Sequence, residues 1–214
     1  MSELFLNGIG ETLVMTFVSG FLGFVLGLPL GVVLFLTRRG QTGENPVLNS
    51  ILSAVVNVFR AIPFMILIVW MIPFTRIIAG TSIGMTAALV PLSVGAAPFI
   101  ARMVENSLLE IPAGLVEASR AMGAGPWAII RKVLIPEALP SLVNGATITL
   151  ITLVGYSAMG GAVGAGGLGQ IGYQYGYVGY DRGIMHLVLA LLVALVFAIQ
   201  AAGNYLCRRT DHRS

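Results

Sequence analysis

Charged residues are scarce in this sequence. Only 10% of its 214 residues are Asp, Glu, Lys or Arg, against roughly 25% in typical soluble domains, and 57% are hydrophobic. The formal net charge of +3 is too small for a nucleic-acid-binding surface. The scarcity of charge therefore disfavours a soluble domain, removes nucleic acid from the expected partners and indicates an integral membrane protein surrounded by lipid.

Cysteine and lysine occur once each. The single cysteine, Cys207, excludes an internal disulfide framework and a cysteine-rich metal cluster. The single lysine, Lys132, is followed by Val133, whereas a Walker A loop requires a lysine followed by Ser or Thr. The chain therefore cannot bind ATP by that route. No spacing of carboxylate, Ser, Cys or His residues is typical of an active site, so we expect no catalysis, cofactor or metal.

Five apolar segments predict five transmembrane helices, because a helix needs about 20 mainly apolar residues to cross a bilayer. They are residues 12–37, 51–74, 77–101, 139–159 and 184–206. Glu3 and the lack of a basic residue before the first segment disfavour a cleaved signal peptide. The sequence therefore predicts an all-α polytopic bundle that forms one domain over residues 1–214, with a polar cytoplasmic loop at 102–137.

All nine Asp and Glu residues lie in loops, at span ends or in the tails of the chain. Carriers coupled to protons or sodium usually place carboxylates within their spans. Active transport by this chain would therefore need energy from another subunit.

The basic residues predict the orientation in the membrane, since cytoplasmic loops are enriched in Lys and Arg. Nine of them fall on one side of the predicted bundle: Arg38, Arg39, Arg102, Arg120, Arg131, Lys132, Arg208, Arg209 and Arg213. Only Arg76 and Arg182 fall on the other side. We therefore expect the N-terminus outside and the C-terminus in the cytoplasm. For Arg60, in the second segment, snorkelling to the cytoplasmic interface is favoured over a gating or pairing role.

The loop at 102–137 is predicted to contain a short amphipathic helix. Pro112 suits a first helical turn, and Gly123 should end the helix before Pro126 begins another. One narrow face collects apolar and small residues, namely Leu115, Ala118, Ser119 and Met122. Glu117 and Arg120 are spaced to form an ion pair along the helix. Such a helix either rests on the membrane surface or fits a groove on a cytoplasmic partner.

The same loop carries a family motif. Residues 117–123 (EASRAMG) and 133–136 (VLIP) resemble the Glu-Ala-Ala…Gly…Ile-x-Leu-Pro signature of ABC-importer permeases, with Ser119, Val133 and Ile135 as mild departures. In that family the loop forms a coupling helix that docks into the ATPase subunit. The resemblance implies coupling roles for Glu117, Ala118, Arg120 and Gly123.

Further stretches resemble the methionine-importer permeases, which are inner-membrane components of binding-protein-dependent transport systems. They are residues 59–64 (FRAIPF), 70–76 (WMIPFTR), 94–102 (VGAAPFIAR) and the Gly- and Tyr-rich run 155–177. The resemblance implies a type I permease fold in the bacterial inner membrane, a homodimer, two ATPase subunits, an extracytoplasmic binding protein and methionine import by alternating access. A passive channel or a structural membrane subunit without ATPase coupling is the alternative.

Glycines mark two further features. Residues 164–169 (GAGGLG) match Gly-x-Gly-x-x-Gly, but a nucleotide site would need a preceding strand, so we expect a broken segment or a flexible loop instead. We expect Tyr156, Met159, Gly160 and Gly161, just before this run, to face the substrate pathway. In the first span, small residues every fourth position allow close helix packing, within the chain rather than in a dimer: Ser19, Gly23, Gly27 and Gly31.

Overall fold

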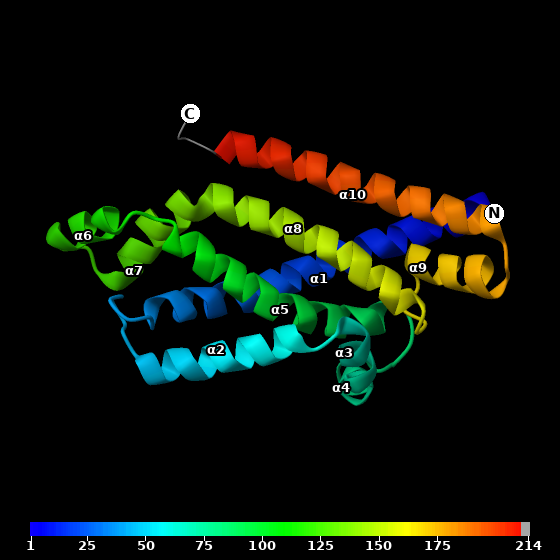
Figure 1. Cartoon of the computed structure of the whole chain (residues 1–214), viewed down its shortest axis with the longest axis horizontal. Helices are drawn as coiled ribbons and strands as arrows, with labels where there is room; N and C mark the ends of the chain where they lie inside the picture. The colour runs from blue at the N-terminus through cyan, green and yellow to red at the C-terminus, as the bar shows by residue number, and fades with distance from the viewer. Residues whose placement is uncertain (211–214) are drawn as a thin grey trace.

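The computed structural model describes residues 1–210, which contain helices and no strand (Figure 1). The long elements are α1 (Ser2–Leu36), α2 (Pro46–Ala61), α5 (Met85–Leu109), α8 (Ile135–Gly161) and α10 (Arg182–Thr210). The short ones are α3 (Phe64–Trp70), α4 (Ile72–Ala79), α6 (Ala113–Ala121), α7 (Pro126–Ile129) and α9 (Gly167–Ile171), with π-helical segments η1 (Ile130–Leu134) and η2 (Gly172–Val178). The predicted all-α architecture is confirmed.

Four helices are long and apolar enough to cross a membrane: α1, α5, the continuous run from α7 to α8, and α10. A fifth span is formed if α2 and α3 are taken together, although the two helices are bent by 99° relative to each other. The bend follows from Pro63, which disfavours helical backbone at Ile62 and cannot continue the hydrogen-bond ladder. The prediction of about five spans therefore holds, with one span broken.

The third span differs from its predicted bounds of 77–101. Gly80 and Gly84 have φ of 74° and 94°, a left-handed conformation that ends one helix and precedes the next, so α5 begins only at Met85. At its other end α5 continues to Leu109, because Arg102 and Glu105 pair with each other inside the helix at 2.6 Å. The non-helical link to α6 is correspondingly shorter than the predicted loop 102–137.

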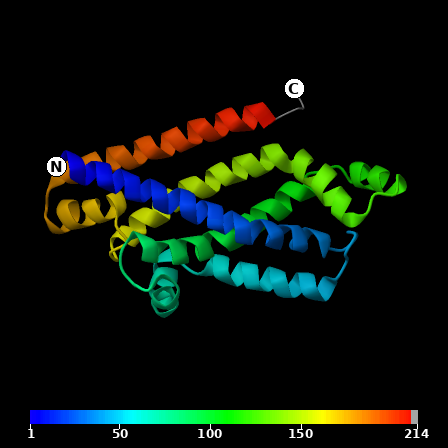
Figure 2. The ribbon, with the colours of Figure 1, turned by 180° about the vertical axis from the view of Figure 1, so that it is seen from behind.

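Helices α1 and α5 approach each other closely along the small residues of α1 (Figure 2). A Cβ atom added at Gly27 would lie 2.6 Å from the carbonyl oxygen of Ala97, and one at Gly31 would lie 2.5 Å from that of Ala101. The predicted ridge therefore serves packing within the chain. In lipid such close contact is what holds helices together, since the surrounding tails are as apolar as the side chains.

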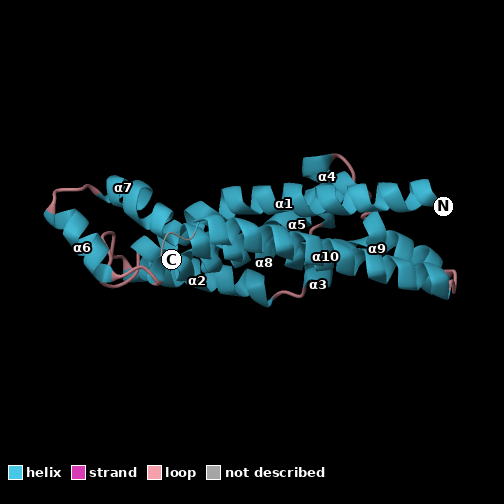
Figure 3. Cartoon of the chain, turned by 90° about the horizontal axis from the view of Figure 1, so that it is seen from above, coloured by secondary structure: helices cyan, strands magenta, loops and turns pink. Residues whose placement is uncertain are grey.

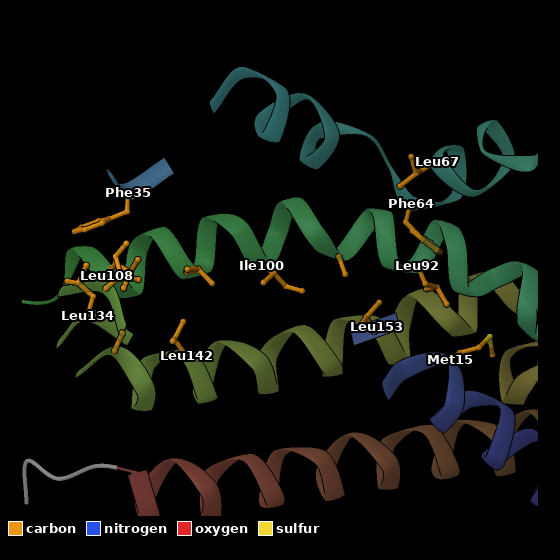
Figure 4. Close-up of a cluster of buried hydrophobic side chains, with 14 of the residues drawn as sticks. Met15, Phe35, Phe64, Leu67, Leu92, Ile100, Leu108, Leu134, Leu142 and Leu153 are labelled. Carbon is orange, nitrogen blue, oxygen red and sulfur yellow. The ribbon is translucent and has the colours of Figure 1, made fainter. Parts of the chain in front are cut away.

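The main apolar core lies between α5 and α8, with contributions from α1 and α3 (Figure 4). Leu92, Ile100 and Leu108 of α5 face Leu142 and Leu153 of α8 along this layer. The core extends to Leu134 of η1, so the bundle stays packed up to the short helices at its end.

The start of α1 and the end of α10 lie at opposite ends of the bundle (Figures 1 and 3). The α1–α2 link, α6 and α7 share the end at which α10 finishes. The basic residues expected on the cytoplasmic side therefore belong to segments at or near one end, with Arg213 outside the described residues.

Candidate functional site

Helix α6 begins and ends as its sequence predicts. Pro112 precedes its first turn, and Gly123 ends it with a φ of 80°. The Gly123 amide donates to the carbonyl oxygen of Arg120 at 2.9 Å, and the Ala124 amide donates to that of Ser119 at 3.0 Å. This pair of bonds is a Schellman motif, which requires left-handed backbone at the glycine. Pro126 then opens α7.

The apolar face of α6 points outward. Val116 and Ser119 are buried, whereas Leu115, Ala118 and Met122 are exposed, Met122 to 81%. Of the predicted apolar face, only Ser119 is therefore buried. The three exposed residues follow the i, i+3, i+7 spacing of a helix that binds in a groove. Together with Trp127 of α7, which is 72% exposed, they form what we call the α6 surface.

The link between α1 and α2 contacts α6. The guanidinium of Arg120 donates to the hydroxyl of Thr42, and within the described residues no ion pair joins it to Glu117. The predicted Glu117–Arg120 pair is therefore not formed. A cavity of about 170 Å³ lies beneath the helix and is lined by residues that include Phe35, Gln41, Val116 and Glu117.

A buried carboxylate joins three helices near this end. Glu105 is 3% exposed, accepts from Arg102 at 2.6 Å and lies 3.6 Å from the guanidinium of Arg38. Arg102 also donates to the carbonyl oxygen of Ser53 at 3.3 Å and to the side chain of Asn57 at 3.1 Å. The Glu105 cluster therefore ties the end of α1 and the body of α2 to α5.

The four residues expected to face the pathway lie together at the end of α8. Tyr156 stacks on Phe64 of α3 with ring centroids 4.3 Å apart, and Met159 is 48% exposed. Gly160 and Gly161 are buried, and a Cβ at Gly161 would lie 2.2 Å from the Gln170 amide nitrogen. The side-chain surface at this position comes from Tyr156 and Met159, while Gly161 allows α8 to contact α9 and Gly160 faces the link that precedes α9.

The glycine-rich run forms a break between helices, so the broken-segment interpretation is favoured over a flexible loop. Gly166 and Gly167 have φ of 92° and 74°, and α9 begins at Gly167. The Glu11 carboxylate accepts from the Gly167 amide at 2.6 Å, and the Thr12 hydroxyl accepts from the Leu168 amide at 2.9 Å. Residues of α1 thus cap α9, a contact over 156 positions that no local pattern predicts.

A second site was missed by sequence reasoning. A cavity of about 240 Å³, which we call the polar groove, lies between α2, α5 and α8. Its polar lining residues are Arg60, Arg102, Asn106, Ser107, Glu110, Ser141 and Asn144. Ser107 donates to Ser141 at 3.0 Å, and Ser141 donates to Glu110 at 3.1 Å. The polar residues that α5 contributes fell within the predicted loop 102–137 and not within an apolar segment, and nothing in the sequence indicates that they meet those of the second and fourth segments.

Several apolar spans, an outward-facing amphipathic helix at one end and a sequence without a Walker A motif define a membrane subunit of the importer-permease class. The chain belongs to the family described as binding-protein-dependent transport system inner membrane component, which matches residues 23–212. The family resemblance based on the coupling motif is confirmed.

Similar proteins share this family. The chain is 74% identical over 161 residues to the D-methionine transport system permease protein MetI of Salmonella typhimurium, covering 75% of this chain and 74% of that protein. It is 53% identical over 212 residues to the probable D-methionine transport system permease protein MetI of Vibrio cholerae, covering 99% and 94% respectively.

Solved structures give the same result for the fold. A chain in the inward-facing MetNI methionine ABC transporter superimposes with a TM-score of 0.97 at 70% identity, covering 98% of this chain and 97% of that one. A chain of an amino acid ABC transporter superimposes with a TM-score of 0.79 at 19% identity, covering 97% and 94%. Because its sequence identity is only 19%, the second match supports the fold alone.

Proposed function

We propose that this chain is the membrane-spanning permease subunit of an ATP-driven importer that carries methionine into the cytoplasm. The observation that carries the proposal is the 70% identity over 98% of the chain to a subunit of a methionine ABC transporter, with a TM-score of 0.97. The permeases named for D-methionine support the same substrate class. Because the only lysine cannot complete a Walker A loop, ATP hydrolysis belongs to a partner chain.

In the proposed assembly two copies of this chain form the pathway and two ATPase subunits bind the two α6 surfaces. Leu115, Ala118 and Met122 enter a groove on the ATPase, with Glu117 and Arg120 at the edge of the contact. Gly123 maintains the end of the helix in its left-handed conformation. A binding protein on the opposite side supplies the substrate.

Transport then follows from a shift in population between two states. ATP binding draws the ATPase subunits and the attached α6 helices together, which favours an outward-open bundle, and hydrolysis restores the inward-open one. ATP can do this only by binding the outward state more tightly than the inward state. Tyr156 and Met159 border the pathway near the end of α8, where Gly161 packs against α9 and Gly160 faces the link that precedes it.

The proposed orientation places α6 and the end of α10 in the cytoplasm of a bacterium and the start of α1 outside. This orientation is supported by the basic segments, which lie at or near the α6 end of the bundle (Figure 3), because cytoplasmic loops are enriched in Lys and Arg. Cys207 at the end of α10 would then lie on the reducing side.

Co-expression with the ATPase subunit of the same transport system tests the proposal. We expect the two chains to co-purify, and ATP hydrolysis by the complex to change when methionine and the binding protein are added. A chain that never co-purifies with an ATPase, or a complex whose hydrolysis ignores both additions, would contradict it and favour a passive channel or a structural subunit.

A further inference from the structure

Three polar side chains of the spans are exposed and have no side-chain partner among the described residues: Arg60 on α2, Asn106 on α5 and Asn144 on α8. Polar and charged groups within a membrane are strongly disfavoured against lipid and instead face protein or a water-filled cavity. All three line the polar groove. This face of the bundle therefore borders water or another protein surface, not hydrocarbon.

Arg60 lies far along α2 from the α6 end of the bundle. It is in the last turn of α2, fourteen positions beyond Pro46 at the α6 end, which is roughly 21 Å along the helix. The hydrocarbon core is only about 30 Å thick, and an arginine side chain is much shorter than that distance. We therefore favour a role for Arg60 within the polar groove over snorkelling to the cytoplasmic interface.

The carboxylates around the groove already have partners. Glu105 is paired with Arg102 and lies near Arg38, and Glu110 accepts from Ser141. Arg60 forms no ion pair with either of them. Because neither carboxylate is paired with Arg60, its guanidinium is available to bind the carboxylate of a ligand through two parallel hydrogen bonds.

The groove also has an apolar wall, formed by Phe99, Met103 and Ile148. Its volume of about 240 Å³ leaves room for a small ligand. A cationic side chain, two amide side chains and an apolar wall suit a ligand with a carboxylate, an ammonium group and an apolar side chain.

We propose that the polar groove is a substrate site on the translocation pathway and that Arg60 receives the α-carboxylate of the transported amino acid. Asn106 and Asn144 offer amide oxygens to its ammonium group, and its side chain lies against Phe99, Met103 and Ile148. This inference rests on the proposed function and names the substrate site for it.

Equilibrium binding to the nucleotide-free complex of permease and ATPase tests the assignment, with the binding protein omitted so that its own selectivity does not contribute. The probes are labelled methionine and methioninol, in which a hydroxymethyl group replaces the carboxylate. Arg60→Gln should weaken methionine binding roughly tenfold or more, the loss expected for one charge-assisted interaction, and leave methioninol binding unchanged. Arg76→Gln, an equal loss of charge at an exposed position of α4, should bind both probes as the unmodified complex does.

Three results would overturn the proposal. The first is unchanged methionine binding in Arg60→Gln, and the second is no methionine binding to the unmodified complex at millimolar concentration. The third is a lower melting temperature of Arg60→Gln with an unchanged ratio of affinities for the two probes. The last would assign Arg60 to contact with the second copy. ATP-dependent methionine uptake by the unmodified complex tests the proposed function separately, since uptake that persists fully in Arg60→Gln would reject the site and retain the function.

Discussion

At the scale of single residues, the least replaceable side chain near the α6 end is Glu105. Its carboxylate is buried and its two neighbours are arginines on different segments. A buried ion pair is costly to break because removal of one partner leaves an uncompensated charge. The charges of Arg102 and Glu105 led the sequence to predict that the third span ends at residue 101. The same two residues therefore explain both the stability of this end and the error in the predicted boundary.

Replacement of Glu105 by alanine should therefore destabilise the bundle by about 3 kcal/mol, the usual cost of breaking a buried pair. The measurement is the melting temperature of the purified complex in detergent. Glu3→Ala removes a carboxylate from an exposed position in the first turn of α1 and serves as the control, which should melt with the unmodified protein. Equal melting temperatures for the two variants would mean that the cluster contributes nothing.

At the scale of elements, the contact of α1 with α5 depends on glycines whose spacing is visible in the sequence. Close approach in lipid requires small residues at the contact, and Gly23, Gly27 and Gly31 occupy it. The partner helix was not predictable, because the same spacing would serve a dimer equally well. The structure assigns the ridge to α5 through the short distances to Ala97 and Ala101.

Gly27→Leu should disrupt this contact and sharply lower the yield of folded protein. An added Cβ at this position meets the backbone oxygen of Ala97 at 2.6 Å, and backbone cannot move aside as a side chain can, so the cost exceeds the roughly 1–3 kcal/mol of ordinary overpacking. Gly10→Leu on the same helix has no atom within 4 Å of the added Cβ and should leave the yield unchanged. Size-exclusion profiles of both variants would decide, and a normal profile for Gly27→Leu would contradict the packing account.

Helix α6 shows what local sequence can and cannot predict. Its start and end follow from Pro112, Gly123 and Pro126 because proline and glycine act on the backbone where they stand. Its buried face depends on distant residues such as Phe35 and Gln41 beneath the helix, so the predicted face was mostly exposed. The polar groove was missed for the same reason, since its residues come from three helices.

Gly123→Val should weaken binding of the ATPase without unfolding the bundle. A β-branched residue is strained at a φ of 80°, so the Schellman motif opens and the α6 surface is displaced. Gly125→Val is a matched control, because Gly125 has a φ of −71° and extended backbone that valine readily adopts before a proline. Co-purification with the ATPase should fall several-fold for the first variant only, and equal recovery of the ATPase with both would contradict the role of Gly123.

At the scale of the whole molecule, the ends of the bundle differ in charge and therefore in their expected surroundings. Membrane-impermeant thiol labelling in intact cells tests this in a Cys207→Ser background, which removes the only native cysteine. A cysteine at Ser82, between α4 and α5, should label from outside, whereas one at Glu44, between α1 and α2, should label only after lysis. The reverse pattern would invert the proposed orientation.

The central claim is that methionine moves through this chain with energy taken from a partner at the α6 surface. The most direct measurement is uptake of labelled methionine into proteoliposomes that contain the permease, the ATPase and the binding protein. The account predicts accumulation against a gradient with ATP, none with ADP, and loss of accumulation in Gly123→Val. Equilibration of methionine without ATP, or full accumulation in Gly123→Val, would contradict it.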